Sequence, residues 1–151
     1  MSQEEDIKQE IAKRFSGLAD KIRIPRPRRL YIEIDLANFK PLFECAAQEL
    51  GFSHLLSITG LDEGENLSFI YHLAKDGGMV LNLKTSVSKN NPAIDTVTSY
   101  FPGAEIYERE LIDLFGAKVQ GLPAGNRYPL TDDWPKDQYP LRKDWKPNQG
   151  K

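Results

Sequence analysis

Cysteine is almost absent from this sequence: Cys45 is the one residue of its kind among 151. A single thiol excludes an internal disulfide, and it excludes an iron–sulfur or zinc site built from cysteines of this chain. The surrounding LFECAAQEL is typical of an amphipathic helix, so we expect a small buried side chain there. Lack of disulfides is typical of a reducing compartment.

Long apolar runs and an excess of positive charge are also missing. No stretch approaches the ~18 apolar residues of a membrane span, and the acidic start MSQEEDIKQE lacks the apolar core of a signal peptide. We therefore expect a soluble chain that reaches a membrane only through a partner. A net charge of −2 disfavours a general nucleic-acid binder, which needs a basic excess. The one basic cluster, RIPRPRR at residues 23–29, leaves a lipid or nucleic-acid adaptor as an alternative.

The patterns of nucleotide, nucleophile and metal sites are missing as well. The sequence has no GxGxxG, GxxxxGK[ST] or GxSxG pattern. Its two histidines, His54 and His72, lie in separate apolar segments without HxxxH or HExxH spacing. We expect structural roles for both, with no catalytic residue, no metal and no cofactor bound by this chain.

Helix and strand patterns alternate over residues 1–120. Apolar residues at helical spacing predict an amphipathic helix over about residues 3–16. A short strand at 21–24 and a strand in LYIEID, residues 30–35, follow. A second helix is expected near 38–50, with Asn38 as N-cap, Pro41 in its first turn and Gly51 just beyond its end.

Three strands are then predicted in quick succession at 53–60, 67–74 and 79–87. The short turns between them indicate antiparallel hairpins. In NNPAIDTVTSYF, Asn91 and Pro92 have the chemistry of a helix start, so a helix is predicted there, ended by PG at 102–103. The fold class is therefore α+β: a mainly antiparallel or mixed sheet of about four strands, packed with helices.

A different composition begins at Gly121. Residues 121–151 hold five of the ten prolines and both tryptophans, with no usable period. We expect two parts, an α+β domain over 1–120 and an extended tail over 121–151. Because large rings disfavour free solution, the tail should dock on its own domain or on another subunit, and it should be partly mobile without that partner.

The stretch YERELIDLFG, residues 107–116, predicts a charged helix. Arg109 would pair with Glu105 and with Asp113 at i,i+4 spacing, and a buried stripe would comprise Ile106, Leu111, Leu114 and Phe115. Glu108 and Glu110 lie about 200° apart on a helix, so they cannot form one carboxylate dyad. Spacing alone favours a solvated helix; a small acid/base enzyme using Glu108, Glu110 or Asp113 is the alternative.

This helix and the tail together carry two ordered motifs. YERELIDLFGAKVQGLP followed by YPLTDDWPKDQYPLRKDW resembles the signature of the 30-kDa subunit family of respiratory complex I, the C-type subunit of NADH–quinone oxidoreductase. Relatives of this family occur in membrane-bound energy-converting [NiFe] hydrogenases. The positions that match the family pattern are Glu108, Arg109, Glu110, Asp113, Phe115, Gly116, Gly121, Pro123, Asp133, Trp134, Pro140, Leu141, Arg142, Lys143, Asp144 and Trp145.

The resemblance implies a cofactor-free structural or assembly subunit in the hydrophilic arm of a complex-I-type membrane oxidoreductase. The matching residues would form its partner interface. The implied partners are a hydrogenase-like large subunit of the D type and iron–sulfur subunits, which would hold the iron–sulfur clusters and a flavin or NiFe centre. The chain would lie peripherally on the cytoplasmic face of the membrane. The equivalent subunit of a ferredoxin-dependent hydrogenase is the alternative.

Overall fold

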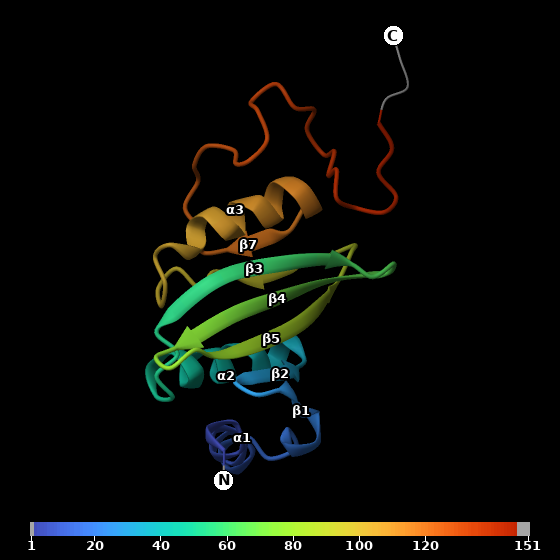
Figure 1. The fold of residues 1–151 in the computed structure, drawn as a ribbon. Helices are drawn as coiled ribbons and strands as arrows, with labels where there is room; N and C mark the ends of the chain where they lie inside the picture. Colours follow the sequence, from blue (N-terminus) through green and yellow to red (C-terminus); the bar gives the residue numbers. More distant parts are fainter. Residues whose placement is uncertain (1, 148–151) are drawn as a thin grey trace. The chain divides into compact units, whose positions relative to one another are not determined.

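The computed structural model describes residues 2–147. Its internal contacts divide the chain into two compact units, Met1–Thr59 with Phe69–Ser86, and Gly60–Ser68 with Val87–Lys151. The boundary predicted at residue 121 falls inside the second unit. The elements in chain order are α1 (Gln3–Arg14), η1 (Ala19–Lys21), β1 (Ile22–Arg26), β2 (Arg29–Glu33), α2 (Leu36–Gln48), β3 (His54–Asp62), β4 (Asn66–Lys75), β5 (Met79–Ser88), β6 (Ala93–Asp95), α3 (Ala104–Phe115) and β7 (Lys118–Gln120) (Figure 1).

Helix α1 of the first unit forms where its periodicity predicts. Ser2 is its N-cap, and the Ser2 hydroxyl accepts a hydrogen bond from the Glu5 N–H at 3.3 Å. Acidic residues fill the first turn and basic residues the last, which complements the helix dipole. Ile11 is fully buried on its inner face.

Helix α2 begins earlier than predicted. Asp35 occupies the N-cap position, and Asn38, the expected cap, lies within the first turn, where its side-chain amide donates to the Asp35 carboxylate at 2.7 Å. Pro41 is consequently inside the helix and not in its first turn. Gly51 follows the helix end with φ +81°, a left-handed conformation that glycine adopts without strain.

A five-stranded sheet runs in the order β1-β2-β5-β4-β3. Strands β1 and β2 pair antiparallel, whereas β2 pairs in parallel with β5, Leu30 opposite Leu81. The connections β3–β4 and β4–β5 are three residues long, so these neighbours reverse direction. The sheet is therefore mixed, as predicted, with one strand more than expected.

Aromatic packing joins α2 to this sheet within the first unit. The ring of Tyr71 on β4 lies 4.7 Å from the ring of Phe39 and 5.6 Å from that of Phe43, between centroids. All three residues are buried. Cys45 on the same helix is buried as expected, and burial raises the pKa of its thiol.

The second unit contains a strand where a helix was predicted after Asn91. Residues Ala93–Asp95 form β6, which pairs in parallel with β7. Burial of Ile94 explains the error, because β-branched side chains favour a pleated strand over a helix. The helix-start chemistry of Asn91 and Pro92 here serves the turn that enters β6.

Helix α3 follows the Pro–Gly break as predicted, and residues 121–147 form no helix or strand. We call residues 121–147 the tail. Within the second unit the tail loops over α3 (Figure 1). No helix among the described residues is long and apolar enough to cross a membrane.

Candidate functional site: helix α3 and the tail

Glu108 anchors α3 inside the second unit. Its side chain is fully buried, and it accepts hydrogen bonds from the Thr96 hydroxyl at 2.6 Å and from the Val97 N–H at 2.9 Å. Burial raises the pKa of Glu108, while these two donors favour the carboxylate. The solvated-helix prediction is therefore wrong for Glu108: this carboxylate fixes the segment after β6.

Arg109 connects the first turn of α3 to the start of the tail. Its guanidinium donates to the Glu105 carboxylate at 2.8 and 3.0 Å, which confirms the predicted i,i+4 pair, and to the Pro123 carbonyl at 2.8 Å. A Cβ at Gly125 would lie 2.5 Å from the same guanidinium. The tail therefore passes closely over Arg109 at this point.

Asp113 binds the tail and does not pair with Arg109, so the predicted Arg109–Asp113 pair is wrong. Its carboxylate, 6% exposed, accepts the Leu130 N–H at 3.1 Å and lies 3.7 Å from the Arg127 guanidinium. Ile106 also departs from the prediction. It was assigned to the buried stripe, yet it is 55% exposed.

The Phe–Gly pair ends α3 with a left-handed turn. Gly116 has φ +76°, its N–H donates to the Ile112 carbonyl, and the next N–H, that of Ala117, donates to the Leu111 carbonyl at 3.2 Å. The bond from the Gly116 N–H to the Ile112 carbonyl is that of an αL C-cap motif, which favours glycine at the left-handed position. It leaves the Phe115 carbonyl free to accept the Arg142 Nε–H at 2.6 Å.

The tail lies directly against Gly116. A Cβ at this glycine would come within 2.6 Å of the Tyr139 ring and 2.8 Å of the Arg142 guanidinium. Arg142 also stacks on Tyr139, 4.9 Å from the ring centroid, and the Leu141 N–H donates to the Leu114 carbonyl at 3.0 Å. Absence of a side chain at position 116 therefore makes room for the tail.

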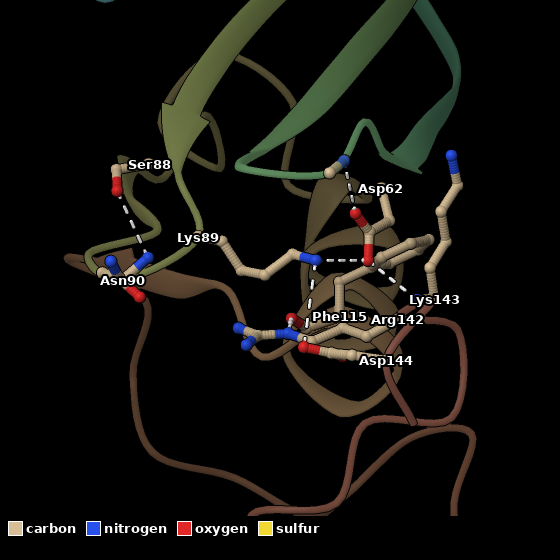
Figure 2. Close-up of polar contacts among 9 residues, drawn as sticks. Asp62, Ser88, Lys89, Asn90, Phe115, Arg142, Lys143 and Asp144 are labelled. Atoms are coloured by element: carbon tan, nitrogen blue, oxygen red, sulfur yellow. Dashed lines mark hydrogen bonds and ion pairs between the residues drawn. The ribbon is translucent and has the colours of Figure 1, made fainter. Parts of the chain in front are cut away.

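Asp62, at the end of β3, holds the tail from a different element (Figure 2). Its carboxylate accepts the Lys143 N–H at 2.7 Å and the Gly64 N–H at 2.9 Å, and it pairs with the Lys89 ammonium at 2.7 Å. The same ammonium lies 4.0 Å from the Asp144 carboxylate. Burial alone would raise the pKa of Asp62, but these donors outweigh it and lower the pKa to about 2.

The two tryptophans of the tail pack on each other. The ring centroids of Trp134 and Trp145 are 5.9 Å apart, and both indole N–H groups donate to Gln138, one to its backbone carbonyl and one to its side chain. The Trp134 carbonyl accepts from Arg127 at 2.6 Å. The rings thus order the tail from within, and both are half-buried.

The side chains of the remaining family positions contribute less to these contacts. Glu110 is half-buried on α3, and the Asp133 carboxylate accepts from the neighbouring Thr131 hydroxyl. Gly121 turns the chain with φ +84°, and Pro140 is half-buried beside Leu141. The side chains of Leu141, Lys143 and Asp144 are exposed, although the backbone of the first two is hydrogen-bonded inward.

This arrangement positions backbone and does not assemble reactive groups. Glu108, Asp113 and Asp62 each accept at least one backbone N–H, and each holds a different residue, Val97, Leu130 and Lys143 respectively. Residues 2–147 contain no group of three or more His, Cys, Asp or Glu side chains that could hold a metal. His72 is held between Thr59 and Asn82 at 2.8 and 2.6 Å, in the first unit.

Several residues of the site were not predicted from the sequence, among them Asp62, Lys89, Thr96 and Arg127. Asp62 does carry a local signal, since an aspartate two residues before a glycine commonly accepts the N–H at that position in a turn. Its contacts with Lys89 and Lys143 join residues far apart in the sequence, and no local pattern specifies such contacts.

The sequence matches a known family over most of its length. Residues 32–151 match the family described as "Respiratory-chain NADH dehydrogenase, 30 Kd subunit", and this range contains α3, the tail and Asp62. The chain belongs to this family. The resemblance inferred from the two motifs is thereby confirmed.

Individual relatives agree. The chain is 34% identical over 127 residues to the C subunit of F(420)H(2) dehydrogenase from Methanosarcina mazei, covering 80% of this chain and 77% of that one. It is 33% identical to the C subunit of NADH-quinone oxidoreductase from Moorella thermoacetica, covering 58% of this chain and 61% of the relative. It is 38% identical over 84 residues to the C/D subunit of NADH-quinone oxidoreductase from Phocaeicola vulgatus, covering 53% of this chain and 16% of that protein.

A solved structure shares the fold. A chain in the structure of the membrane-bound sulfane sulfur reductase, described as an archaeal respiratory membrane complex, superposes with a TM-score of 0.83 at 26% identity. The alignment covers 94% of this chain and 85% of the other. The α+β assignment is confirmed by this neighbour and by the mixed sheet.

Proposed function

We propose that this chain is a structural and assembly subunit in the hydrophilic arm of a complex-I-type membrane oxidoreductase. One observation in the second unit carries the proposal: the two family motifs form a single contact in which the charged groups hold backbone. Arg109, Asp113 and Arg142 all bind carbonyl or N–H groups across the α3–tail contact. These side chains therefore hold the tail in position on α3, and under this proposal the redox chemistry takes place in neighbouring subunits.

The proposed partners are a large subunit of the D type and iron–sulfur subunits. The relative named as a C/D subunit supports the first, because this chain corresponds to 16% of that longer protein. Under this proposal the iron–sulfur clusters, and a flavin or NiFe centre, belong to the partners. The chain then lies on the cytoplasmic face of the membrane without entering it. The relatives reported above give no specific support to the hydrogenase alternative.

The proposed interface is the outer surface of α3 and the tail. Its exposed family positions would face the partner, whereas buried ones such as Glu108 and Gly116 would hold that surface in place. Three large apolar side chains are exposed here: Ile106 at 55%, Tyr128 at 47% and Leu141 at 52%. Apolar and aromatic side chains at the centre of an interface, with charged groups such as Lys143 and Asp144 around them, are typical of protein–protein contacts.

Affinity purification from the native membrane tests the assignment. The tagged chain, recovered after gentle solubilisation, should bring a large subunit and iron–sulfur proteins with it in fixed ratio. Recovery of the chain by itself, from membranes where the tag is accessible, would refute the proposal.

A pair of leucine variants tests the interface. Leu141→Ser should reduce recovery of the large subunit, because Leu141 is exposed and only its backbone is used within the second unit. Leu36→Ser is the matched control, since Leu36 is 43% exposed at the start of α2 in the first unit. Equal recovery with both variants would place the partner elsewhere.

A further inference from the structure

The β1–β2 hairpin of the first unit concentrates positive charge. Residues 22–29 contain four arginines and no acidic residue, in a chain whose net charge is −2. These residues precede the range that matches the family, residues 32–151. Their charge therefore belongs to this chain's own N-terminal part, and the function proposed above makes no use of it.

The tip of the hairpin is held in a fixed conformation. Arg28 has φ +62°, which is uncommon for a residue other than glycine. The Glu4 carboxylate of α1, itself 7% exposed, accepts the Arg28 N–H. The Arg29 guanidinium donates to the carbonyls of Arg28 and Gly78 at 2.9 and 3.0 Å. Backbone strain that is stabilised by such specific contacts clusters at functional sites.

Arg26 and Arg28 are the exposed cations of this tip. No ion-pair partner of Arg26 or Arg28 is found among residues 2–147, and both side chains are exposed. The Glu4 carboxylate accepts the Arg28 backbone N–H and also attracts the Arg28 charge, but no ion pair within 4 Å joins the two side chains. Arg14 in the same unit shows the usual alternative, because it pairs with Glu10 at 2.7 Å and also with Glu49. Two such guanidinium groups on a rigid tip are suited to bind an anion.

A groove of about 520 Å³ continues this surface along β1. It is lined by Arg23, Ile24, Pro25 and Tyr31, and the Arg23 guanidinium lies 4.6 Å from the Tyr31 ring centroid. The groove thus offers an aromatic and an aliphatic wall beside positive charge. Extended peptide with alternating acidic and small apolar side chains matches such a lining.

We propose that the β1–β2 hairpin docks a carboxylate-rich peptide segment of a neighbouring protein subunit, with Arg26 and Arg28 as the forked donors. All four cations are arginines, whose planar fork matches a carboxylate in bidentate geometry better than lysine does. Pro25 removes one N–H from the β1 edge, so recognition proceeds through side chains more than through strand addition.

The distribution of exposed apolar side chains disfavours a lipid surface as the occupant. Stable peripheral membrane binding combines basic charge with inserted apolar side chains. None of the large apolar residues that are exposed in the described chain lies on the hairpin.

Peptide binding by the full chain tests the proposal directly. Fluorescence anisotropy with a labelled peptide of about ten residues, alternating Glu and Ala, would be measured at low and at physiological salt. The double variant Arg26→Ala/Arg28→Ala should bind roughly fivefold or more weakly than the wild type. Arg26→Lys/Arg28→Lys should fall between them, because it keeps the charge and loses the fork.

The double variant Lys13→Ala/Lys40→Ala is the charge-matched control. Both lysines are exposed on helices of the first unit, and their loss should change affinity by less than about twofold. If the lysine variant loses as much peptide affinity as the arginine variant, binding depends on the overall charge of the chain and not on the hairpin, and the proposal is overturned. Absence of peptide binding at low salt would overturn it as well.

A second measurement identifies the occupant in the assembled complex. A photo-crosslinking amino acid at position 27, between the two arginines, should give adducts with an Asp- or Glu-rich protein segment. Adducts with lipid only, together with arginine-dependent sedimentation on phosphatidylcholine–phosphatidylglycerol vesicles, would assign the hairpin to the membrane and refute the proposal. Because the Leu141→Ser variant probes the tail separately, failure of either proposal remains distinguishable from failure of the other.

Discussion

Replacement of Gly116 by alanine is the most informative single change in the α3–tail contact. The residue ends α3 with φ +76°, and a Cβ there would lie 2.6 Å from the Tyr139 ring and 2.8 Å from the Arg142 guanidinium. Real Cβ atoms do not approach other groups so closely. The alanine methyl group therefore has to displace the part of the tail that packs on the helix end.

Two costs add in this variant. Alanine in the left-handed region is disfavoured by about 1 kcal/mol. Displacement of Arg142 also breaks its 2.6 Å bond to the Phe115 carbonyl, and a bond from a charged donor contributes about 1.5–3 kcal/mol. We expect Gly116→Ala to destabilise the docked tail by about 2.5–4 kcal/mol.

Tryptophan fluorescence measures the docked tail selectively. The only two tryptophans of the sequence, Trp134 and Trp145, lie in the tail and pack on each other. In Gly116→Ala their emission should shift to longer wavelength and become more sensitive to quencher, while the far-ultraviolet circular dichroism of the sheet and helices persists. Urea unfolding followed by both signals would give the two stabilities.

Gly77→Ala provides the control for backbone strain. Gly77 has φ +90°, and nothing lies within 4 Å of the position a Cβ would take, so only the left-handed cost of about 1 kcal/mol applies. If both variants lose the same stability and neither changes the tryptophan emission, the tail does not pack on Gly116, and the reasoning is wrong.

Three further changes test other parts of the second unit. Folding lowers the pKa of Asp62 from 3.8 to about 2. The ionised Asp62 carboxylate therefore contributes about 1–2 kcal/mol, after screening, to the free energy of unfolding above pH 3.8, and this contribution is lost as pH falls through 2. Asp62→Asn should abolish the corresponding acid transition in tryptophan emission. Glu108→Ala should lower the free energy of unfolding, measured by thermal unfolding, by about 2–3 kcal/mol, because the buried Val97 N–H loses its acceptor. Glu108→Gln should lower it less. Unchanged unfolding would show that Glu108 does not anchor α3. Gly60→Ala should lower the free energy of unfolding in urea by about 1–3 kcal/mol, because its Cβ would lie 2.4 Å from the Phe115 ring. Wild-type stability of this variant would mean that the Phe115 ring moves aside without cost.

Secondary structure was predictable where pattern and turn chemistry agree. The hairpins from β3 to β5 combine strand alternation with three-residue connections, and α3 combines a Pro–Gly start with a Phe–Gly end. The segment after Asn91 misled the prediction because two signals conflict. Pro92 favours a helix start, whereas Ile94 favours a strand, and the pairing of β6 with β7 decides between them.

The motif residues of the candidate site were predictable from the sequence, but their partners were not. The family motifs indicated Arg109, Asp113, Gly116 and Arg142 as important. Their partners could not be derived from periodicity, because most are backbone groups of a segment without any period. Glu108 is buried because the loop after β6 covers it. The position of that loop cannot be read from the periodicity of α3.

The contacts also explain why the two motifs occur together in one chain. Within the second unit, the backbone of Leu141 binds the Leu114 carbonyl and that of Lys143 binds Asp62, while both side chains point to solvent. The helix motif thus fixes the path of the tail, and the tail motif determines what that path displays. A change at Gly116 or Asp62 would disturb the displayed surface without altering any residue on it. Variants at these two positions should therefore weaken partner recovery in proportion to tail release, whereas Leu141→Ser should weaken it with the tail still docked.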